Sequence, residues 1–306
     1  MDLTLLESPN WKDYELLDSG DGLKLERFGP YRFVRPEVQA IWKRSLKASV
    51  WQDAHGIFRP TSEESGGHWD TKTKLNEKWQ MSYSHQTSSK SKIRFSVMTT
   101  PGRHLGVFPE VAAHWDWFSE LIEKVGRPVK VLNLFGYTGL ASLMAAQAGA
   151  EVTHVDASKK SVTWARENQS LSGLDQKPIR WIVDDALKYV QREGRRAVKY
   201  DGIILDPPKF GRGPKGEIWE IYESLPGLLQ ACREVLSEQP LFMVTTMYAV
   251  RASAVHLYQT LDEMMKPYHG SVDAGELVTR ESTRGYLLSQ AVYARWQAST
   301  SQPGNK

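Results

Sequence analysis

The sequence lacks the features of a disulfide-linked, metal-binding or membrane protein. It has a single cysteine, Cys232, among 306 residues, so no internal disulfide can form. The eight histidines show no paired spacing with cysteine or acidic residues, and we therefore expect no structural metal. No apolar run approaches the roughly 20 residues that a membrane helix needs, and the acidic N-terminus is unlike a secretory signal. We expect a cytoplasmic protein that does not enter a membrane.

The sequence also has no large excess of either sign of charge. The net charge of +3 is too small to predict a nucleic-acid partner by itself. Its distribution is more informative, because no carboxylate lies between Gln80 and Pro109, whereas Lys90, Lys92 and Arg94 do. A locally positive surface there favours contact with phosphates, and a solvated hairpin is the alternative. The sequence leaves the oligomeric state open between monomer and homodimer.

The length allows two domains, since single hydrophobic cores stop growing near this size. Residues 1–102 alternate short apolar runs with turns such as SGDG and FGPY, which predicts a small β-rich domain with a possible role in substrate recognition. Residues 103–306 alternate β-type runs with segments of helical period, a pattern typical of βαβ units. The sequence therefore predicts an α/β fold: a Rossmann-like, doubly wound, mostly parallel sheet of seven strands beside a β-rich domain.

The predicted elements of the second domain follow one another closely. Strands are expected at 129–135, 150–156, 179–184, 201–206 and 240–246, with a final pair near 276–279 and 286–296. Helices are expected at 139–148, 158–171, 186–195, 218–236 and 252–265. Ser158 is a suitable N-cap, and Gly149 and Gly173 suit helix C-termini.

A glycine-rich turn, NLFGYTG at residues 133–139, follows the first of these strands. Gly136 and Gly139 would let the backbone approach a ligand closely, and the positive helix N-terminus can face an anionic group such as a carboxylate. Ligands of doubly wound sheets bind at the carboxyl ends of the strands. The turn is therefore a candidate cofactor site, although it does not match the full dinucleotide fingerprint.

Acidic residues follow the next two strands. Asp156 lies 20 residues after Gly136, where a carboxylate can accept hydrogen bonds from ribose hydroxyls. Asp184, Asp185 and Ala186 follow the third strand, and we favour Asp185 as the partner of an adenine amino group. Each acid alone could be a helix N-cap, but acids at successive strand ends favour nucleoside binding.

The fourth strand ends in Asp206-Pro207-Pro208, followed by Lys209 and Phe210. Two prolines cannot continue a central strand, because they lack N–H donors and fix φ. The chain must leave the sheet there and present Asp206 with the neighbouring carbonyl groups. Such a group can accept a hydrogen bond from a substrate N–H and direct a lone pair at an electrophilic methyl group, which a nicotinamide-dependent oxidoreductase does not need. Simple strand termination is the alternative.

These motifs resemble those of the class I S-adenosylmethionine-dependent methyltransferases, and within them the bacterial 23S ribosomal RNA large-subunit family that methylates cytosine C5 or guanine N7. The resemblance covers roughly residues 103–246 through NLFGYTG, THVDASKKSVTWARENQSLSGL, DDA and DPPKF, but not the N-terminal RNA-binding module of that family. It implies S-adenosyl-L-methionine as cofactor. The residues implied to bind it are Phe108, Asn133, Phe135, Gly136, Tyr137, Thr138, Gly139, Asp156, Ala157, Asp184, Asp185, Ala186 and Asp206. The resemblance places Asp206 and Pro207 on the substrate side, where Phe210 could stack on a flipped base.

The cysteine content bears on the acceptor atom. Cytosine C5 is a weak nucleophile that commonly needs a cysteine adduct. After the fifth strand this chain has Thr245, Thr246 and Met247, and Cys232 lies in an apolar helical pattern typical of a buried thiol. We therefore favour a nitrogen acceptor over cytosine C5, since nitrogen needs no adduct.

Residues 209–216 bring Lys209, Arg212 and Lys215 to the end of the fourth strand. A flexible basic lid there suits contact with a phosphate backbone, and a mobile loop with solvated charges is the alternative. We expect methyl transfer to an RNA base, with ribosomal RNA as the first candidate. A small molecule or a protein side chain is the alternative substrate.

Overall fold

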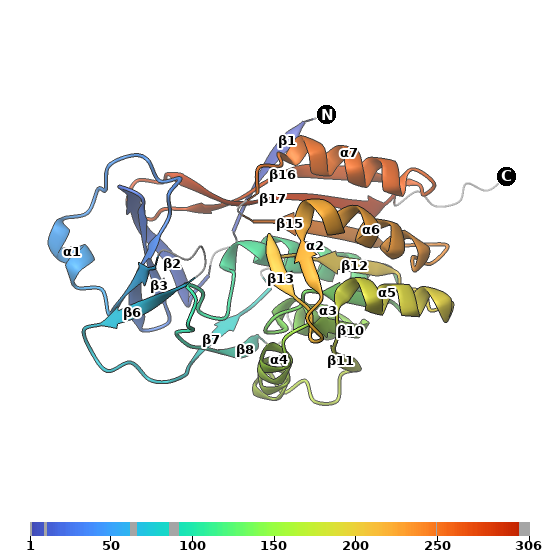
Figure 1. The fold of residues 1–306 in the computed structure, drawn as a ribbon, viewed down its shortest axis with the longest axis horizontal. Helices are drawn as coiled ribbons and strands as arrows, with labels where there is room; N and C mark the ends of the chain where they lie inside the picture. The colour runs from blue at the N-terminus through green and yellow to red at the C-terminus, as the bar shows by residue number, and fades with distance from the viewer. Residues whose placement is uncertain (1, 9–10, 62–65, 86–91, 249, 300–306) are drawn as a thin grey trace. The chain divides into compact units, whose positions relative to one another are not determined.

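The structure, a computed structural model, describes residues 2–8, 11–61, 66–85, 92–248 and 250–299 (Figure 1). The chain divides into two units. The larger unit comprises residues 1–6, 114–276 and 291–306, and the smaller comprises residues 7–113 and 277–290.

An eight-stranded sheet forms the centre of the larger unit. In spatial order its strands are β1 (Leu3–Glu7), β16 (Gly270–Arg280), β17 (Leu287–Ala298), β15 (Phe242–Met247), β12 (Gly202–Leu205), β9 (Lys130–Leu134), β10 (Glu151–Asp156) and β11 (Ile179–Val183). The run from β15 to β11 is parallel, and β17 pairs with β15 in the antiparallel direction. The seven predicted strands are present, and β1 is an addition to them.

Helices cover both faces of this sheet (Figure 1). They are α2 (Ala112–Lys124), α3 (Leu140–Ala148), α4 (Lys159–Leu171), α5 (Ala186–Arg195), α6 (Ile221–Glu234) and α7 (Ala254–Met265). Alternate residues of β9 point to opposite faces of the sheet. Leu132 and Leu134 pack in the core under α5, α6 and α7, whereas Asn133 bonds to Ser142 of α3. This is the doubly wound arrangement that the sequence predicts.

Most helix ends lie where the capping residues place them. Ser158 accepts a hydrogen bond from the Ser161 N–H at 3.2 Å and begins α4. Gly149 ends α3 with a φ of 120°, which glycine adopts more readily than other residues. The prediction for residues 218–236 was wrong at its start, because Ile218–Glu220 form a strand and α6 begins at Ile221.

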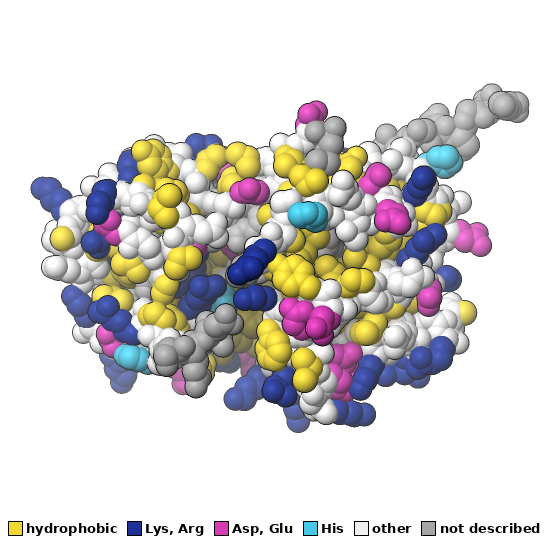
Figure 2. Space-filling view, turned by 45° about the horizontal axis from the view of Figure 1, so that its top comes forward, with side chains coloured by type: hydrophobic (Ala, Val, Ile, Leu, Met, Phe, Trp, Pro, Cys, Tyr) yellow, Lys and Arg dark blue, Asp and Glu magenta, His cyan; other side chains and the backbone are white. Residues whose placement is uncertain are grey.

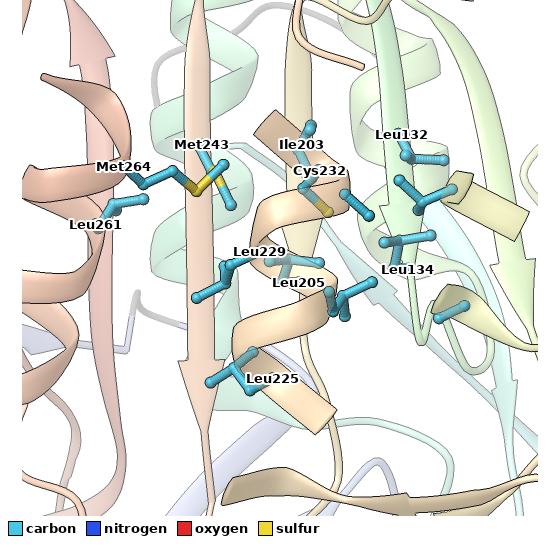
Figure 3. Close-up of a cluster of buried hydrophobic side chains, with 14 of the residues drawn as sticks. Leu132, Leu134, Ile203, Leu205, Leu225, Leu229, Cys232, Met243, Leu261 and Met264 are labelled. Atoms are coloured by element: carbon cyan, nitrogen blue, oxygen red, sulfur yellow. The ribbon is translucent and has the colours of Figure 1, made fainter. Parts of the chain in front are cut away.

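The core beneath α5, α6 and α7 includes Cys232 (Figure 3). Its side chain lies among aliphatic residues such as Ile203 and Leu205 of β12 and Leu229 of α6. Burial raises the pKa of the Cys232 thiol, so it stays protonated. The prediction of a buried thiol is confirmed.

The smaller unit is rich in β-structure, as predicted for the N-terminal region. Its five-stranded sheet contains β2 (Tyr14–Gly20), β3 (Leu23–Phe28), β4 (Tyr31–Pro36), β5 (Gly56–Pro60) and β6 (Gly67–Thr71). Beside these the unit has the hairpin β7 (Trp79–Tyr83) and β8 (Ile93–Val97), the short helix α1 (Ala48–Gln52) and the 3-10 helix η1 (Pro109–Val111).

The division into units differs from the predicted ranges 1–102 and 103–306, because the smaller unit extends to residue 113, residues 1–6 belong to the larger unit, and residues 277–290 join the smaller unit. The last of these differences is the least expected from the sequence. Arg284 explains this. Its guanidinium Nη2 bonds to Asp18 at 3.1 Å and to Glu281 at 2.8 Å, and both carboxylates are buried. Buried carboxylates need such a partner, so the segment is held to β2 despite its distance in sequence.

Among the described residues, no helix is long and apolar enough to cross a membrane. The same residues contain no cluster of three or more His, Cys, Asp or Glu side chains arranged to hold a metal ion.

Candidate active site

The turn between β9 and α3 has an unusual backbone. Phe135 and Tyr137 adopt left-handed φ values of 58° and 48°, and Gly139 has a φ of 85°. Aromatic residues enter this region at a cost of about 1–3 kcal/mol, and such strain is found mainly at functional sites. The sequence draws attention to the glycines of this turn, but two of its three left-handed positions are aromatic.

The glycines are required by packing within the protein. A Cβ at Gly136 would lie 2.4 Å from the ring of buried His154, and one at Gly139 would lie 2.7 Å from the Cβ of Ala165 and 3.1 Å from the ring of Trp181. We expected these glycines to admit a ligand. The structure shows that they admit the side chains of β10, α4 and β11, and the close approach of a ligand to the turn stays a prediction.

We expect Gly136→Ala to destabilise the protein by about 1–3 kcal/mol, because the new methyl group overlaps the His154 ring. Thermal unfolding would measure the change. Gly227→Ala is the matched control: Gly227 is exposed within α6, and nothing lies within 4 Å of its Cβ position. The control should be neutral or stabilising by up to about 1 kcal/mol. Equal melting temperatures for Gly136→Ala and wild type would contradict the packing argument.

Asn133 lies beneath the turn. Its side-chain amide donates to Ser142 Oγ at 2.9 Å, and Ser142 Oγ lies 3.0 Å from His154 Nδ1. All three residues are buried, and burial lowers the pKa of His154 to about 3, so the imidazole is neutral. This polar chain joins β9, α3 and β10 directly under the turn. A direct contact between Asn133 and the cofactor stays a prediction.

Asp156 ends β10 beside the turn. Its carboxylate accepts the Tyr137 N–H at 2.9 Å and the Ser158 N–H at 2.8 Å. Burial raises the pKa of Asp156, although these two hydrogen bonds oppose the change. Burial and the nearby Asp156 also raise the pKa of Tyr137 to about 12. Asp156 is thus fixed in position, with lone pairs left to accept ribose hydroxyls.

The raised pKa of Asp156 predicts two opposite pH effects. The folded protein binds a proton at Asp156 at a higher pH than the unfolded chain does. The free energy of unfolding therefore increases as the pH falls through the raised pKa, and this contribution is lost as the pH rises again. Affinity for S-adenosylhomocysteine should fall over the same acid range, because a protonated carboxyl group is a poorer acceptor. Calorimetry at a series of pH values from neutral into the acid range would measure this. Asp156→Asn should remove this contribution, and an unchanged pH dependence in the variant would contradict the assignment.

Asp184 and Asp185 follow β11 and are already engaged. Asp184 accepts the Asp185 N–H at 2.9 Å and binds the Arg192 guanidinium. Asp185 caps α5 by accepting the Lys188 N–H at 2.9 Å. The structure therefore shows the N-cap role that we held as the alternative for Asp185. Its proposed contact with adenine would use the remaining acceptor capacity.

Asp206 follows β12 directly. Pro207 is buried and Pro208 is exposed, so the chain leaves the sheet at this point, as predicted. The next residues form a hairpin of β13 (Phe210–Arg212) and β14 (Ile218–Glu220), which corrects the expectation of a flexible loop over residues 209–216. The reason is Trp219, which is buried and donates from its indole to the Pro208 carbonyl at 2.7 Å.

Trp219 is a residue that the sequence interpretation missed. Its ring contacts Phe135, with centroids 4.8 Å apart. Phe135 belongs to the turn between β9 and α3, the candidate cofactor site, which we call the cofactor turn. The turn sequence GPKGE, which lies between FGR and IWE, could have indicated the hairpin. Trp219 is the residue of its strand that points toward the protein interior. The helical pattern that follows obscured it.

The acids come to one edge of the sheet. In the parallel register Leu134 pairs with both Val155 and Leu205, and Asp156 pairs with Val183. Phe135, Asp156, Asp184 and Asp206 therefore follow the ends of four adjacent strands, at the carboxyl edge where doubly wound folds bind ligands. At the same edge Gly139 is the N-cap of α3, and it has no side chain to cap the first N–H groups.

The remaining predicted residues lie in both units. Phe108 precedes η1 in the smaller unit and packs against His104, with ring centroids 4.8 Å apart. Lys92 and Arg94 are exposed in the smaller unit, and Lys90 lies outside the described residues. Three further cations are exposed in the larger unit: Lys209, Arg212 and Lys215.

A model of the S-adenosylmethionine-dependent methyltransferases matches residues 72–270, more than half of the chain. The chain belongs to this family. Because the match begins at residue 72, this methyltransferase shares family sequence within its smaller unit as well.

Two curated relatives act on ribosomal RNA by name. The methyltransferase is 36% identical over 115 residues to ribosomal RNA large subunit methyltransferase I of Aeromonas salmonicida, covering 37% of this chain and 26% of that protein. It is 30% identical over 175 residues to ribosomal RNA large subunit methyltransferase K/L of Shewanella sp. strain ANA-3, covering 56% and 23%. The chain thus spans about a quarter of the length of these relatives.

Solved structures agree on the fold. A SAM-dependent methyltransferase from Agrobacterium tumefaciens superposes with a TM-score of 0.90 at 49% identity, over 97% of this chain and 94% of that one. A methyltransferase complexed with SAH superposes with a TM-score of 0.69 at 18% identity, over 94% and 76%. The second likeness is evidence of fold alone.

The residues at the sheet edge fit S-adenosylmethionine. The cofactor carries ribose hydroxyls that need acceptors and a carboxylate that needs donors. Asp156 would supply fixed acceptor atoms, and the start of α3, which has no side-chain cap, would supply donors with a favourable dipole.

Proposed function

We propose that this methyltransferase transfers the methyl group of S-adenosylmethionine to a nitrogen of an RNA base, with ribosomal RNA as the first candidate. The observation that carries the proposal is the position of Asp206 and Pro207, which follow β12 next to the strand that leads into the cofactor turn. The names of the curated relatives support an RNA substrate.

Three groups of this chain would hold the cofactor. Asp156 accepts the ribose hydroxyls, the region of Asp185 and Ala186 accepts adenine, and the first turn of α3 donates to the carboxylate. The backbone of Phe135 to Thr138 surrounds the methionine portion. When bound, the cofactor supplies an electrophilic methyl group on a positively charged sulfur.

Asp206 would orient the acceptor. Its carboxylate and the adjacent carbonyl groups accept hydrogen bonds from a substrate N–H, so that the nitrogen lone pair faces the methyl carbon. The bound cofactor would supply its methyl group to the acceptor nitrogen, and Asp206 or water would take up a proton lost from an amino nitrogen. Pro207 has no N–H that could compete for these acceptors.

The buried thiol argues against cytosine C5 as the acceptor. A C5 mechanism through an adduct needs a thiolate that reaches the base. Cys232 is the sole cysteine of the chain, is fully buried, and has a raised pKa. It therefore cannot supply that nucleophile from its place in the core.

On the face that Figure 2 displays, the basic residues do not form one continuous surface. Figure 2 shows Lys and Arg side chains interspersed with acidic and hydrophobic side chains on the displayed face. The RNA proposal therefore rests on particular groups near the sheet edge and not on net charge. An RNA substrate also supports our proposal that the protein acts in the cytoplasm.

Methyl-labelled cofactor would test the substrate class. The full chain would be incubated separately with ribosomal subunits, tRNA, a protein extract and a metabolite pool, and nucleoside analysis would locate the label. We expect an N-methylated base in RNA. Label found only in a metabolite or a protein would refute the RNA proposal and favour the alternative substrates.

A further inference from the structure

The hairpin β13–β14 has two faces of different character. Gly211 pairs with Trp219, and the flanking pairs are Phe210 with Glu220 and Arg212 with Ile218. Because paired residues share a face and successive residues alternate, the Trp219 face is opposite the face that carries Phe210, Arg212, Ile218 and Glu220. The Trp219 face packs on Phe135, so the other face points away from the cofactor turn.

The outer face exposes large apolar side chains. Phe210 is 56% exposed and Ile218 is 66% exposed, and Tyr222, at the start of the adjoining helix α6, is 49% exposed. Exposed apolar side chains cost little singly, but a group of them beside a catalytic motif favours a binding role. Aromatic side chains that stand free of the core offer a surface on which nucleobases stack.

The charges around this face favour an anionic partner. Residues 207–216 contain three cations, Lys209, Arg212 and Lys215, and no carboxylate. The two following acids are engaged within the protein: Glu217 binds Lys188 Nζ at 2.7 Å, and Glu220 caps α6 through the Glu223 N–H at 3.1 Å.

The hairpin is firmly joined to the reaction edge. β13 begins four residues after Asp206 in the sequence, the Trp219 indole bonds to the Pro208 carbonyl, and the Ile221 N–H donates to the Lys209 carbonyl at 3.1 Å. These contacts fix the outer face relative to Asp206. A substrate strand whose acceptor base reaches Asp206 must therefore pass close to it.

We propose that the outer face of β13–β14, formed by Phe210, Arg212 and Ile218, binds a nucleotide next to the target base in an unpaired RNA strand. This rests on the proposed function and assigns its substrate class. A base stacks on Phe210 and Ile218, and Arg212 contacts a phosphate. Phe210 thereby serves a neighbouring nucleotide and not the target base, because its side chain points away from the cofactor turn. A paired strand could not bind in this way, because its bases stack on each other.

The test measures binding of a labelled single-stranded RNA of about 12 nucleotides, and of the same strand in a duplex, to the full chain with S-adenosylhomocysteine present. Phe210→Ala and Ile218→Asp should each weaken single-strand binding about five- to 100-fold. Arg212→Ala should lower the slope of log Kd against log salt by about 0.7. Affinity for S-adenosylhomocysteine should not change in any of these variants.

Matched controls come from the same unit. Leu5→Asp alters an exposed leucine of β1, a strand at the opposite edge of the sheet from β11. Arg195→Ala alters an exposed arginine in the last turn of α5, a helix that begins at the reaction edge and runs away from it. Both controls should bind the single strand like wild type.

The outcomes separate this inference from the proposed function. If RNA is methylated but the hairpin variants bind and methylate it like wild type, the hairpin role is refuted and the function stands. Equal losses for single strand and duplex would refute the preference for an unpaired strand. If the wild type methylates a protein and no RNA, both proposals fail, and the hairpin would be a protein contact.

Discussion

Asp206→Ala is expected to slow methyl transfer by orders of magnitude while leaving affinity for S-adenosylhomocysteine close to that of wild type. Asp206 follows β12, next to the strand that leads into the turn, whereas it is the Asp156 carboxylate that accepts the Tyr137 N–H of the turn. Its proposed task is to hold the acceptor nitrogen in line with the methyl group, and loss of such positioning costs about 10²- to 10⁴-fold in kcat. Single-turnover methylation of RNA and calorimetry with S-adenosylhomocysteine would measure the two effects.

Asp206→Asn refines this result. The amide keeps one carbonyl oxygen as an acceptor but cannot take up a proton. Partial activity in Asp206→Asn would assign the residue to orientation of the acceptor, and activity as low as in Asp206→Ala would add proton removal to its role. Wild-type kcat in both variants would refute the assignment of Asp206.

Asp156→Ala is expected to act mainly on cofactor binding and to lower the affinity for S-adenosylhomocysteine by about 100-fold or more. Hydrogen bonds to a charged group are worth about 1.5–3 kcal/mol each, and Asp156 is placed to accept two from the ribose. The substitution also leaves the Tyr137 and Ser158 N–H groups without their acceptor, so the strained turn should relax. Calorimetry measures the affinity, and thermal unfolding measures the structural part of the effect.

An exposed acid of the same unit provides the control. Asp262 lies on the exposed side of α7, and Asp262→Ala should change neither cofactor affinity nor activity. If Asp156→Ala and Asp206→Ala lost cofactor affinity equally, the division of roles between the two acids would be wrong.

The element pattern of the larger unit could be predicted because it depends on local sequence. The runs that became β9, β10, β11 and β12 are apolar and short, and those that became α3, α4 and α5 have helical period with caps at their ends. Parallel strands all present their carboxyl ends to one edge, so the spacing of Asp156 and Asp206 after these strands was enough to predict a shared edge.

Other features depend on contacts between distant residues. β1 joins the sheet beside β16, some 270 residues later in the chain, and no local pattern identifies that partner. Residues 277–290 belong to the smaller unit through Arg284 and the buried acids Asp18 and Glu281. In the same way residues 218–220 were predicted as the start of a helix because a helical period follows them, but Trp219 packs on Phe135 as part of a strand.

By itself the sequence determined the doubly wound fold and the row of acids at the strand ends, because periodicity, caps and paired prolines act over a few residues. The methyltransferase family followed from the resemblance of its ordered motifs to those of known members. Only the tertiary structure decided which side chain serves which purpose. In the structure Asp185 caps α5, Asn133 lies under the turn, and Phe210 lies on the outer face of its hairpin. The physical reason is that hydrogen-bond partners and packing neighbours are set by the approach of separate elements, which a single sequence does not specify.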